Sequence, residues 1–316
     1  MATPSEMTYR TLGRSGLMVS TVGIGCNNFG MRIDADATQL VVDAAIDAGI
    51  TLFDTSDSYG DSELFLAKAL GSRRDQVIIA TKFGSDLRGA NGPDWNARGS
   101  RRYVRKAVER SLKRLGTDYI DLYQLHKPDP NTPLEETLAA LTELVRDGLV
   151  RYIGSSNLAG WQISEAEWLA RTNGTERFIS AQNLYSFIER DVETEVVPAC
   201  ETYGVGMLPY FPLASGLLTG KYQRGQEPPS DGRITAWGMT GMLNDRNFDL
   251  VESLTAFAAE RGVTLLDVAM GGLAAQSTVS SVIAGATTPA QVRANASAGL
   301  WVPTADDQKA LRALLI

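Results

Sequence analysis

Short apolar runs alternate along this chain with longer segments in which apolar residues recur every three or four positions. The short runs are typical of buried parallel strands, and the longer periodic segments are typical of amphipathic helices. The predicted strands span residues 19–25, 50–54, 77–82, 120–126, 150–155, 178–182, 205–210 and 279–284. The predicted helices span about residues 36–48, 61–70, 100–115, 133–147, 158–170, 189–203, 264–276 and 289–298.

Eight strands alternating with eight helices predict a parallel sheet, because each crossover must return over the sheet before the next strand begins. We therefore predict an α/β fold, a (β/α)8 TIM barrel, as a single domain over residues 1–316. The alternative is an open doubly wound sheet. Against it, the first strand lacks the Gly-x-Gly-x-x-Gly turn, although Gly23-Ile24-Gly25 matches it in part.

Three predicted segments lie outside the eight strand–helix units. Residues 9–19 read as an N-terminal β-hairpin with its turn at residues 13–16. Two extra helices are predicted, one over residues 247–261 and one over residues 304–316, the second with Thr304 as its cap. The irregular stretches 83–99 and 211–246 follow strands three and seven, and loops of that length in a compact domain are usually functional.

Composition narrows the class of protein. The chain is 44% hydrophobic and 21% charged, as in soluble globular proteins. Its formal net charge of −7 argues against general binding to nucleic acid or anionic lipid. No signal peptide or membrane-spanning run is recognisable. Two cysteines and no zinc-like spacing predict reduced thiols, no metal site and a cytoplasmic location.

Polar side chains stand where several of the predicted strands end. Asp54, Lys82 and His126, the only histidine, end the second, third and fourth runs, and Tyr59 follows five residues after Asp54. Each residue alone has an ordinary structural explanation. In a barrel, however, the carboxyl ends of the strands share one rim. An ammonium there lowers the pKa of a phenol, and an imidazole can donate a hydrogen bond to a carbonyl oxygen. These groups together can therefore protonate the oxygen of a carbonyl whose carbon receives a hydride.

Ordered motifs extend this pattern along the chain. They are Tyr9-Arg10-Thr11-Leu12-Gly13, Phe53-Asp54-Thr55-Ser56-Asp57-Ser58-Tyr59-Gly60, Ala80-Thr81-Lys82-Phe83-Gly84, Asp121-Leu122-Tyr123-Gln124-Leu125-His126, Gly154-Ser155-Ser156-Asn157, Gln182-Asn183-Leu184-Tyr185, Gly216-Leu217-Leu218-Thr219-Gly220-Lys221-Tyr222 and Ile283-Ala284-Gly285-Ala286. With them the chain resembles the aldo-keto reductase superfamily over nearly its whole length.

The resemblance implies an NAD(P)-dependent oxidoreductase that acts on the carbonyl of an aldehyde or ketone, or in reverse on an alcohol. Tyr59 would be the general acid, Lys82 its activator, Asp54 the partner of the lysine, and His126 the donor that orients the carbonyl. The same resemblance implies the cofactor-binding residues Ser156, Asn157, Gln182, Tyr210, Pro212, Leu213, Ser215, Gly216, Leu217, Thr219, Lys221, Arg233, Gly285, Thr287, Thr288, Gln291 and Asn295.

Departures from the family pattern bear on cofactor choice. Phe211 stands where many relatives have serine, and the motif Gly285-Ala286-Thr287-Thr288 lacks the lysine or arginine that NADP-preferring relatives often carry. Arg233 or Arg293 is a candidate replacement for that cation. The family favours NADP, with NAD as the alternative.

Loop residues are candidates for contacts with the carbonyl substrate. They are Asn27, Phe29, Phe83 and Trp95, with Cys26, Tyr185 and Trp237 nearby in the predicted loops. The resemblance also leaves two other hypotheses open: a regulatory subunit like the channel β-subunits that share the barrel, and a barrel whose activity has decayed. A monomer or a small homo-oligomer is expected.

Overall fold

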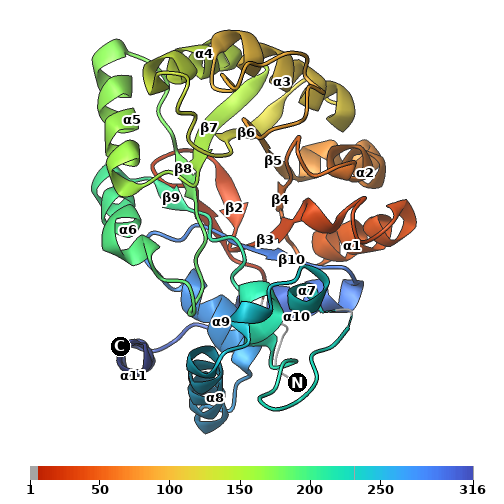
Figure 1. Cartoon of the computed structure of the whole chain (residues 1–316), viewed down its shortest axis with the longest axis vertical. Helices are drawn as coiled ribbons and strands as arrows, with labels where there is room; N and C mark the ends of the chain where they lie inside the picture. Colours follow the sequence, from red (N-terminus) through yellow and green to blue (C-terminus); the bar gives the residue numbers. More distant parts are fainter. Residues whose placement is uncertain (1–5, 231, 316) are drawn as a thin grey trace.

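A computed structural model describes residues 6–230 and 232–315, and a parallel barrel forms its centre (Figure 1). Its strands, in chain order, are β3 (Val22–Gly25), β4 (Leu52–Asp54), β5 (Ile78–Phe83), β6 (Ile120–Leu125), β7 (Val150–Ser156), β8 (Ser180–Gln182), β9 (Gly206–Met207) and β10 (Val282–Gly285). They pair in the order β10-β3-β4-β5-β6-β7-β8-β9, with every pair parallel.

Backbone hydrogen bonds join the two ends of this sheet. The Ser280 N–H donates to Met207 O at 3.0 Å, and the Ile283 N–H donates to Pro209 O at 2.9 Å. Bridges between Met207 and Val279 and between Tyr210 and Ile283 continue the contact. The sheet is thus closed, which confirms the predicted (β/α)8 barrel and excludes the open doubly wound sheet.

Helices form a layer outside the strands (Figure 1). The helices of the barrel units, each of which follows one barrel strand in the chain, are α1 (Ala35–Asp47), α2 (Ser62–Leu70), α3 (Arg101–Leu115), α4 (Leu134–Arg146), α5 (Gly160–Asn173), α6 (Val192–Tyr203), α9 (Leu265–Ala274) and α10 (Pro289–Ala298). In α3, for example, Val104, Val108 and Leu115 are buried while Lys106 and Lys113 are exposed. The apolar stripe that predicted each helix is therefore the face that covers the sheet.

The N-terminal hairpin closes the end of the barrel opposite the site described below. Its strands, β1 (Tyr9–Thr11) and β2 (Met18–Ser20), are antiparallel, and Leu12 between them is buried among residues of the barrel interior. A Cβ on Gly13 would lie 2.5 Å from Ile179 O, so the turn reaches the start of β8 only with glycine there. The predicted strand 19–25 is therefore two strands, β2 and β3, which serve different sheets.

Two predicted extra helices are present as α8 (Asp245–Glu260) and α11 (Ala305–Leu314). The stretch 211–246 also contains α7 (Arg233–Ala236) and the 3-10 turns η3 (Ala214–Thr219) and η4 (Thr240–Met242), which were not predicted; η1 (Cys26–Asn28) and η2 (Gly71–Gln76) are further short turns. These pieces are too short to carry a periodic signal. No helix in the described ranges is long and apolar enough to cross a membrane.

Residues 1–5, 231 and 316 lie outside the described residues, so the single domain over 1–316 stays a prediction. The predicted helix over 304–316 ends at Leu314 among the residues described.

Candidate active site

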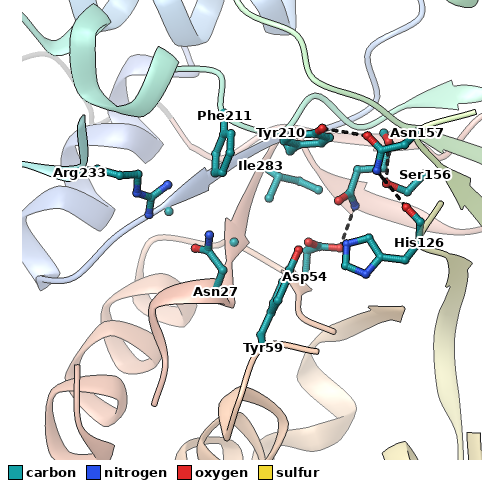
Figure 2. A pocket seen from close by; sticks show the side chains of 13 residues that line it. Asn27, Asp54, Tyr59, His126, Ser156, Asn157, Tyr210, Phe211, Arg233 and Ile283 are labelled. Carbon is teal, nitrogen blue, oxygen red and sulfur yellow. Dashed lines mark hydrogen bonds between the residues drawn. The ribbon is translucent and has the colours of Figure 1, made fainter. Parts of the chain in front are cut away.

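Neighbouring strands bring the predicted chemical groups to one rim of the barrel. Asp54 is the last residue of β4 and pairs in register with Ala80, and Lys82 of β5 pairs with Gln124 of β6. His126 follows directly after β6. At this rim lies a cavity of about 170 Å³ (Figure 2). It is lined by Gly25, Asn27, Asp54, Tyr59, His126, Ser156, Asn157, Gln182, Tyr210, Phe211, Arg233, Ile283 and Gly285.

A buried ion pair lies beneath the cavity. Lys82 Nζ donates to Asp54 Oδ2 at 2.6 Å and to Thr55 O at 2.8 Å, and the lysine is 0% exposed. Burial alone lowers the pKa of Lys82, but the charges of Asp54 and Tyr59 outweigh it and leave the pKa above its ordinary value. The ammonium therefore stays charged in the barrel interior.

Two glutamine amides complete the surroundings of Asp54. Its Oδ1 accepts from Gln182 Nε2 at 2.8 Å and from Gln124 Nε2 at 3.2 Å. Gln124 was missed from the sequence, although a polar side chain inside an apolar strand, two residues before His126 and so on the same face, is a usable signal. The carboxylate is thus held by one cation and two amides.

Tyr59 reaches the ion pair from the loop between β4 and α2. Lys82 Nζ lies 5.0 Å from the centre of its ring, and the ring of His126 lies 5.7 Å away, nearly perpendicular to it. Burial raises the pKa of Tyr59, and this effect outweighs the opposing charge of Lys82. Lys82 thus lowers the pKa of the phenol as expected, but burial raises it by more, and the phenol keeps its proton at neutral pH.

His126 is held by its backbone and by its ring. Its N–H donates to Phe83 O at 2.8 Å, and its Nδ1 lies 3.1 Å from both Ser56 Oγ and Ser85 Oγ. Burial, followed by the positive charges of Lys82 and Lys127, lowers the pKa of the imidazole to about 3. The ring is consequently neutral at neutral pH, so it can donate a hydrogen bond without carrying a charge.

Asp54, Tyr59, Lys82 and His126 are called the tetrad below. Across the cavity, four side chains predicted to bind the cofactor are hydrogen-bonded to one another or to the tetrad (Figure 2). Tyr210 OH donates to Asn157 Oδ1 at 2.8 Å, and Asn157 Nδ2 donates to His126 O at 2.9 Å. Ser156 Oγ donates to Gln182 O at 2.8 Å. Asn157 has a φ of 59°, a conformation that asparagine tolerates better than most residues. These polar groups form a second wall opposite Tyr59.

A second cavity, of about 320 Å³, adjoins the first and shares Phe211, Arg233 and Gly285 with it. The predicted cofactor residues that line it are Pro212, Leu213, Ser215, Gly216, Thr219, Lys221, Arg233, Gly285, Thr287, Gln291 and Asn295. Asn28, Arg32, Leu266, Ala284, Ala286 and Ala294 also line it and were not predicted. The sequence therefore located most of this wall.

Two predicted cofactor residues lie outside the cavity linings. Leu217 is fully buried in the apolar cluster beneath η3. Thr288 caps α10, where its Oγ1 accepts from the Gln291 N–H at 3.3 Å. Neither residue lines either cavity, so both cofactor assignments stay predictions.

Positive charge gathers in the second cavity. Arg233 Nη2 donates to Asn28 Oδ1 at 2.9 Å, and its guanidinium lies 5.3 Å from the ring of Phe211 and 4.8 Å from that of Trp237. Burial, followed by the charge of Arg32, lowers the pKa of Arg233 to about 10. Arg32, Lys221 and Arg233 all line the cavity, and among the described residues no carboxylate lines it.

Of the predicted substrate contacts, Asn27 lines the first cavity and three others do not. Phe29 and Phe83 are 0% exposed, and Phe83 stacks on Tyr123 with ring centres 4.8 Å apart. Trp95 is 74% exposed, packs under the guanidinium of Arg102 and is absent from the lining of both cavities. Phe29 and Phe83 are corrected to core positions, because neither has exposed surface, whereas the assignment of Trp95 stays a prediction.

The remaining substrate candidates, two aromatic residues and one cysteine, are also partly buried in the core and partly near the cavity. Cys26 and Tyr185 are buried and absent from the cavity lining, whereas Trp237 stays near the rim, with its ring 6.2 Å from that of Phe211.

Comparison with known proteins decides the family. The model of the aldo/keto reductase family matches residues 21–316. The chain belongs to the aldo/keto reductase family. Membership of this family makes the chain an oxidoreductase. Asp54, Tyr59, Lys82 and His126 lie together at the rim of its barrel.

Three relatives cover nearly the whole length of this aldo/keto reductase. A probable voltage-gated potassium channel subunit beta of Oryza sativa is 37% identical, over 92% of this chain and 91% of that protein. An uncharacterized oxidoreductase of Bacillus subtilis is 36% identical, over 91% and 89%. The L-glyceraldehyde 3-phosphate reductase of Escherichia coli is 33% identical, over 93% and 88%.

Proposed function

We propose that this protein uses NADPH to reduce the carbonyl group of an aldehyde or ketone to an alcohol, with Tyr59 as the proton donor. One observation carries the proposal: a phenol that keeps its proton and a neutral imidazole line the same cavity, with a buried Lys82–Asp54 pair directly behind them. This arrangement suits the protonation of an oxygen atom on which negative charge develops.

The donor set of the adjoining cavities fits a nicotinamide dinucleotide. Ser156, Asn157 and Gln182 offer amide and hydroxyl groups for a carboxamide, and Tyr210 offers an aromatic ring for stacking. The second cavity offers cations for phosphate groups and the start of α10 for an anion.

The charge of the second cavity favours NADP over NAD. Arg32, Lys221 and Arg233 line it, which suits a ligand that carries a phosphate in addition to the pyrophosphate. Sites that select NAD commonly place a carboxylate against the ribose hydroxyl, and among the described lining residues there is none. We therefore assign Arg32 and Arg233 as candidates for the additional phosphate.

In the reaction the dihydronicotinamide, when bound, supplies a hydride to the carbonyl carbon. Tyr59 gives its proton to the carbonyl oxygen, and the resulting phenolate is stabilised by the ammonium of Lys82, which Asp54 keeps charged. His126, neutral at this pH, orients the carbonyl by donating a hydrogen bond to the same oxygen. Solvent then returns a proton to Tyr59, which restores the enzyme.

Relatives named as probable or putative potassium channel β-subunits raise the question of a regulatory role. Relatives named as reductases have similar identity over a similar share of the chain. Asp54, Tyr59, Lys82 and His126 suit both roles, so they do not decide between them. We propose turnover because the reductase relatives match this chain over the same length, and the experiment below separates the two roles.

The test is reduction of 4-nitrobenzaldehyde and phenylglyoxal with NADPH carrying deuterium on the reactive carbon of its nicotinamide. We expect the alcohol product to contain one deuterium from the cofactor, with NADH the weaker reductant. Tight NADPH binding without any alcohol product across an aldehyde and ketone panel would overturn the assignment and favour the regulatory role.

A further inference from the structure

The inner nitrogen of His126 lies between two serine hydroxyls that come from different loops. Ser56 follows β4 and Ser85 follows β5, and each Oγ lies 3.1 Å from His126 Nδ1. Among the described residues the other ring nitrogen, Nε2, has no hydrogen-bond partner, and the side chain lines the cavity. The two ring nitrogens therefore have different surroundings, one polar and intramolecular, the other open to a ligand.

The hydrogen-bonding options of the two serine hydroxyls determine which ring nitrogen of His126 carries the hydrogen. Ser56 Oγ already accepts from the Ser58 N–H at 3.2 Å and lies 2.9 Å from Ser58 Oγ, which can donate to it, so its own proton is available for Nδ1. Asp57 Oδ1 is a more distant acceptor for that proton, at 3.4 Å. For Ser85 Oγ, Nδ1 is the one acceptor within reach among the described residues.

A neutral imidazole has one N–H, and the lone pair goes to the nitrogen that faces donors. With the lone pair on Nδ1, the two serine hydroxyls share it as an acceptor and Nε2–H faces the cavity. With hydrogen on Nδ1, the serines lose that acceptor, and Nε2 presents a lone pair that repels a carbonyl oxygen. The first arrangement satisfies more polar groups.

We propose that Ser56 and Ser85 are positioning residues that hold His126 as the Nε2–H tautomer, so that a hydrogen-bond donor always faces the substrate oxygen. The benefit to turnover rests on the proposed function, whereas the tautomer itself is a property of the protein that does not depend on it. The two can therefore be tested apart.

The chain offers an unusually direct readout because His126 is its only histidine. Long-range ¹H–¹⁵N correlation spectra of ¹⁵N-labelled protein show one imidazole, whose protonated and unprotonated nitrogens have well-separated shifts. We expect a protonated Nε2 and an unprotonated Nδ1 in the wild type at pH 7. A protonated Nδ1 in the wild type would overturn the proposal without any variant.

Variants then assign the effect to the serines. In Ser56→Ala/Ser85→Ala the two nitrogen shifts should move toward each other as the tautomers mix, and kcat should fall roughly tenfold while the Kd for NADPH is unchanged. Ser85→Thr keeps a hydroxyl and should keep the wild-type spectrum. Ser164→Ala, which removes a hydroxyl bonded to Gly160 O on α5, is the matched control and should change neither readout.

The outcomes separate the two claims. Wild-type nitrogen shifts in the double variant would overturn the role of the serines, and each single alanine variant gives the same test if the double variant folds poorly. A wild-type protein with the Nε2–H tautomer but no reduction of any carbonyl would refute the proposed function and leave the tautomer assignment standing.

Discussion

Replacing Lys82 by methionine tests the buried ion pair on which the site is built. Methionine fills much of the same volume but leaves Asp54, 3% exposed, without the cation that contacts its Oδ2. The two glutamine amides on Oδ1 remain, yet they do not neutralise the carboxylate. Removing one partner of a buried ion pair typically destabilises a protein by about 3–5 kcal/mol, and we expect Lys82→Met to lower the free energy of unfolding by that amount.

The assay is urea unfolding at pH 7, followed by circular dichroism. Asp54→Asn/Lys82→Met should recover most of the loss, because the double variant has no unpaired buried charge. Lys68→Met, at an exposed position of α2, is the control and should stay within about 0.5 kcal/mol of the wild type. A loss below about 1 kcal/mol for Lys82→Met, or a double variant less stable than the single one, would refute this reasoning.

Three further predictions concern charge. Burial, followed by the charge of Glu63, raises the pKa of Asp57 to about 8, so its contribution to stability is present below pH 4 and is lost as the pH rises through 8. Relative to wild type, Asp57→Asn should therefore gain about 1.4 kcal/mol of unfolding free energy per pH unit between pH 4 and 8. If the variant and the wild type differ by the same unfolding free energy at pH 5 and at pH 7, as measured by urea unfolding, this prediction is contradicted. His126, with a pKa near 3, stabilises the fold above pH 6.5 and loses that contribution as the pH falls toward 3, a dependence that His126→Gln should abolish in the same titrations. Arg32→Gln should raise the Kd for NADPH about tenfold and leave that for NADH unchanged in fluorescence titrations; an equal rise for both would refute its role toward the additional phosphate.

The rim chemistry could be predicted from the sequence because a simple rule places it. Strand ends in a parallel barrel share one edge, so Asp54, Lys82 and His126 had to lie near one another once the strands were located. Tyr59 follows because a five-residue spacing from Asp54 leaves it in the same loop. Local patterns and one topological rule were sufficient for this part.

The burial of aromatic residues near the rim could not be predicted in the same way. Phe83 and Phe29 are apolar residues near the rim, but whether such a ring faces the cavity or the core depends on packing partners far away in the chain, such as Tyr123. Trp95 shows the opposite outcome, with its ring outside on the surface. A residue type in a loop does not determine the direction in which the side chain points.

The polar residues around the tetrad could not be predicted from the sequence either. Gln124 lies within a strand whose other residues read as core, and Arg32 lies in a segment without a periodic pattern. The direction of the pKa shift of Tyr59 depends on how deeply the ring is buried, and burial outweighs Lys82 here. Each of these features is set by tertiary contacts and not by spacing along the chain.

Tyr59→Phe, assayed with 4-nitrobenzaldehyde as substrate, tests the central claim most directly. The substitution removes the one hydroxyl assigned to protonate the carbonyl oxygen and leaves the aromatic ring beside Lys82 and His126. We predict that kcat, followed by the loss of NADPH absorbance, falls at least about a hundredfold, while the Kd for NADPH stays at the wild-type value in a fluorescence titration. A variant that keeps the wild-type kcat would contradict the assignment of Tyr59 as the proton donor.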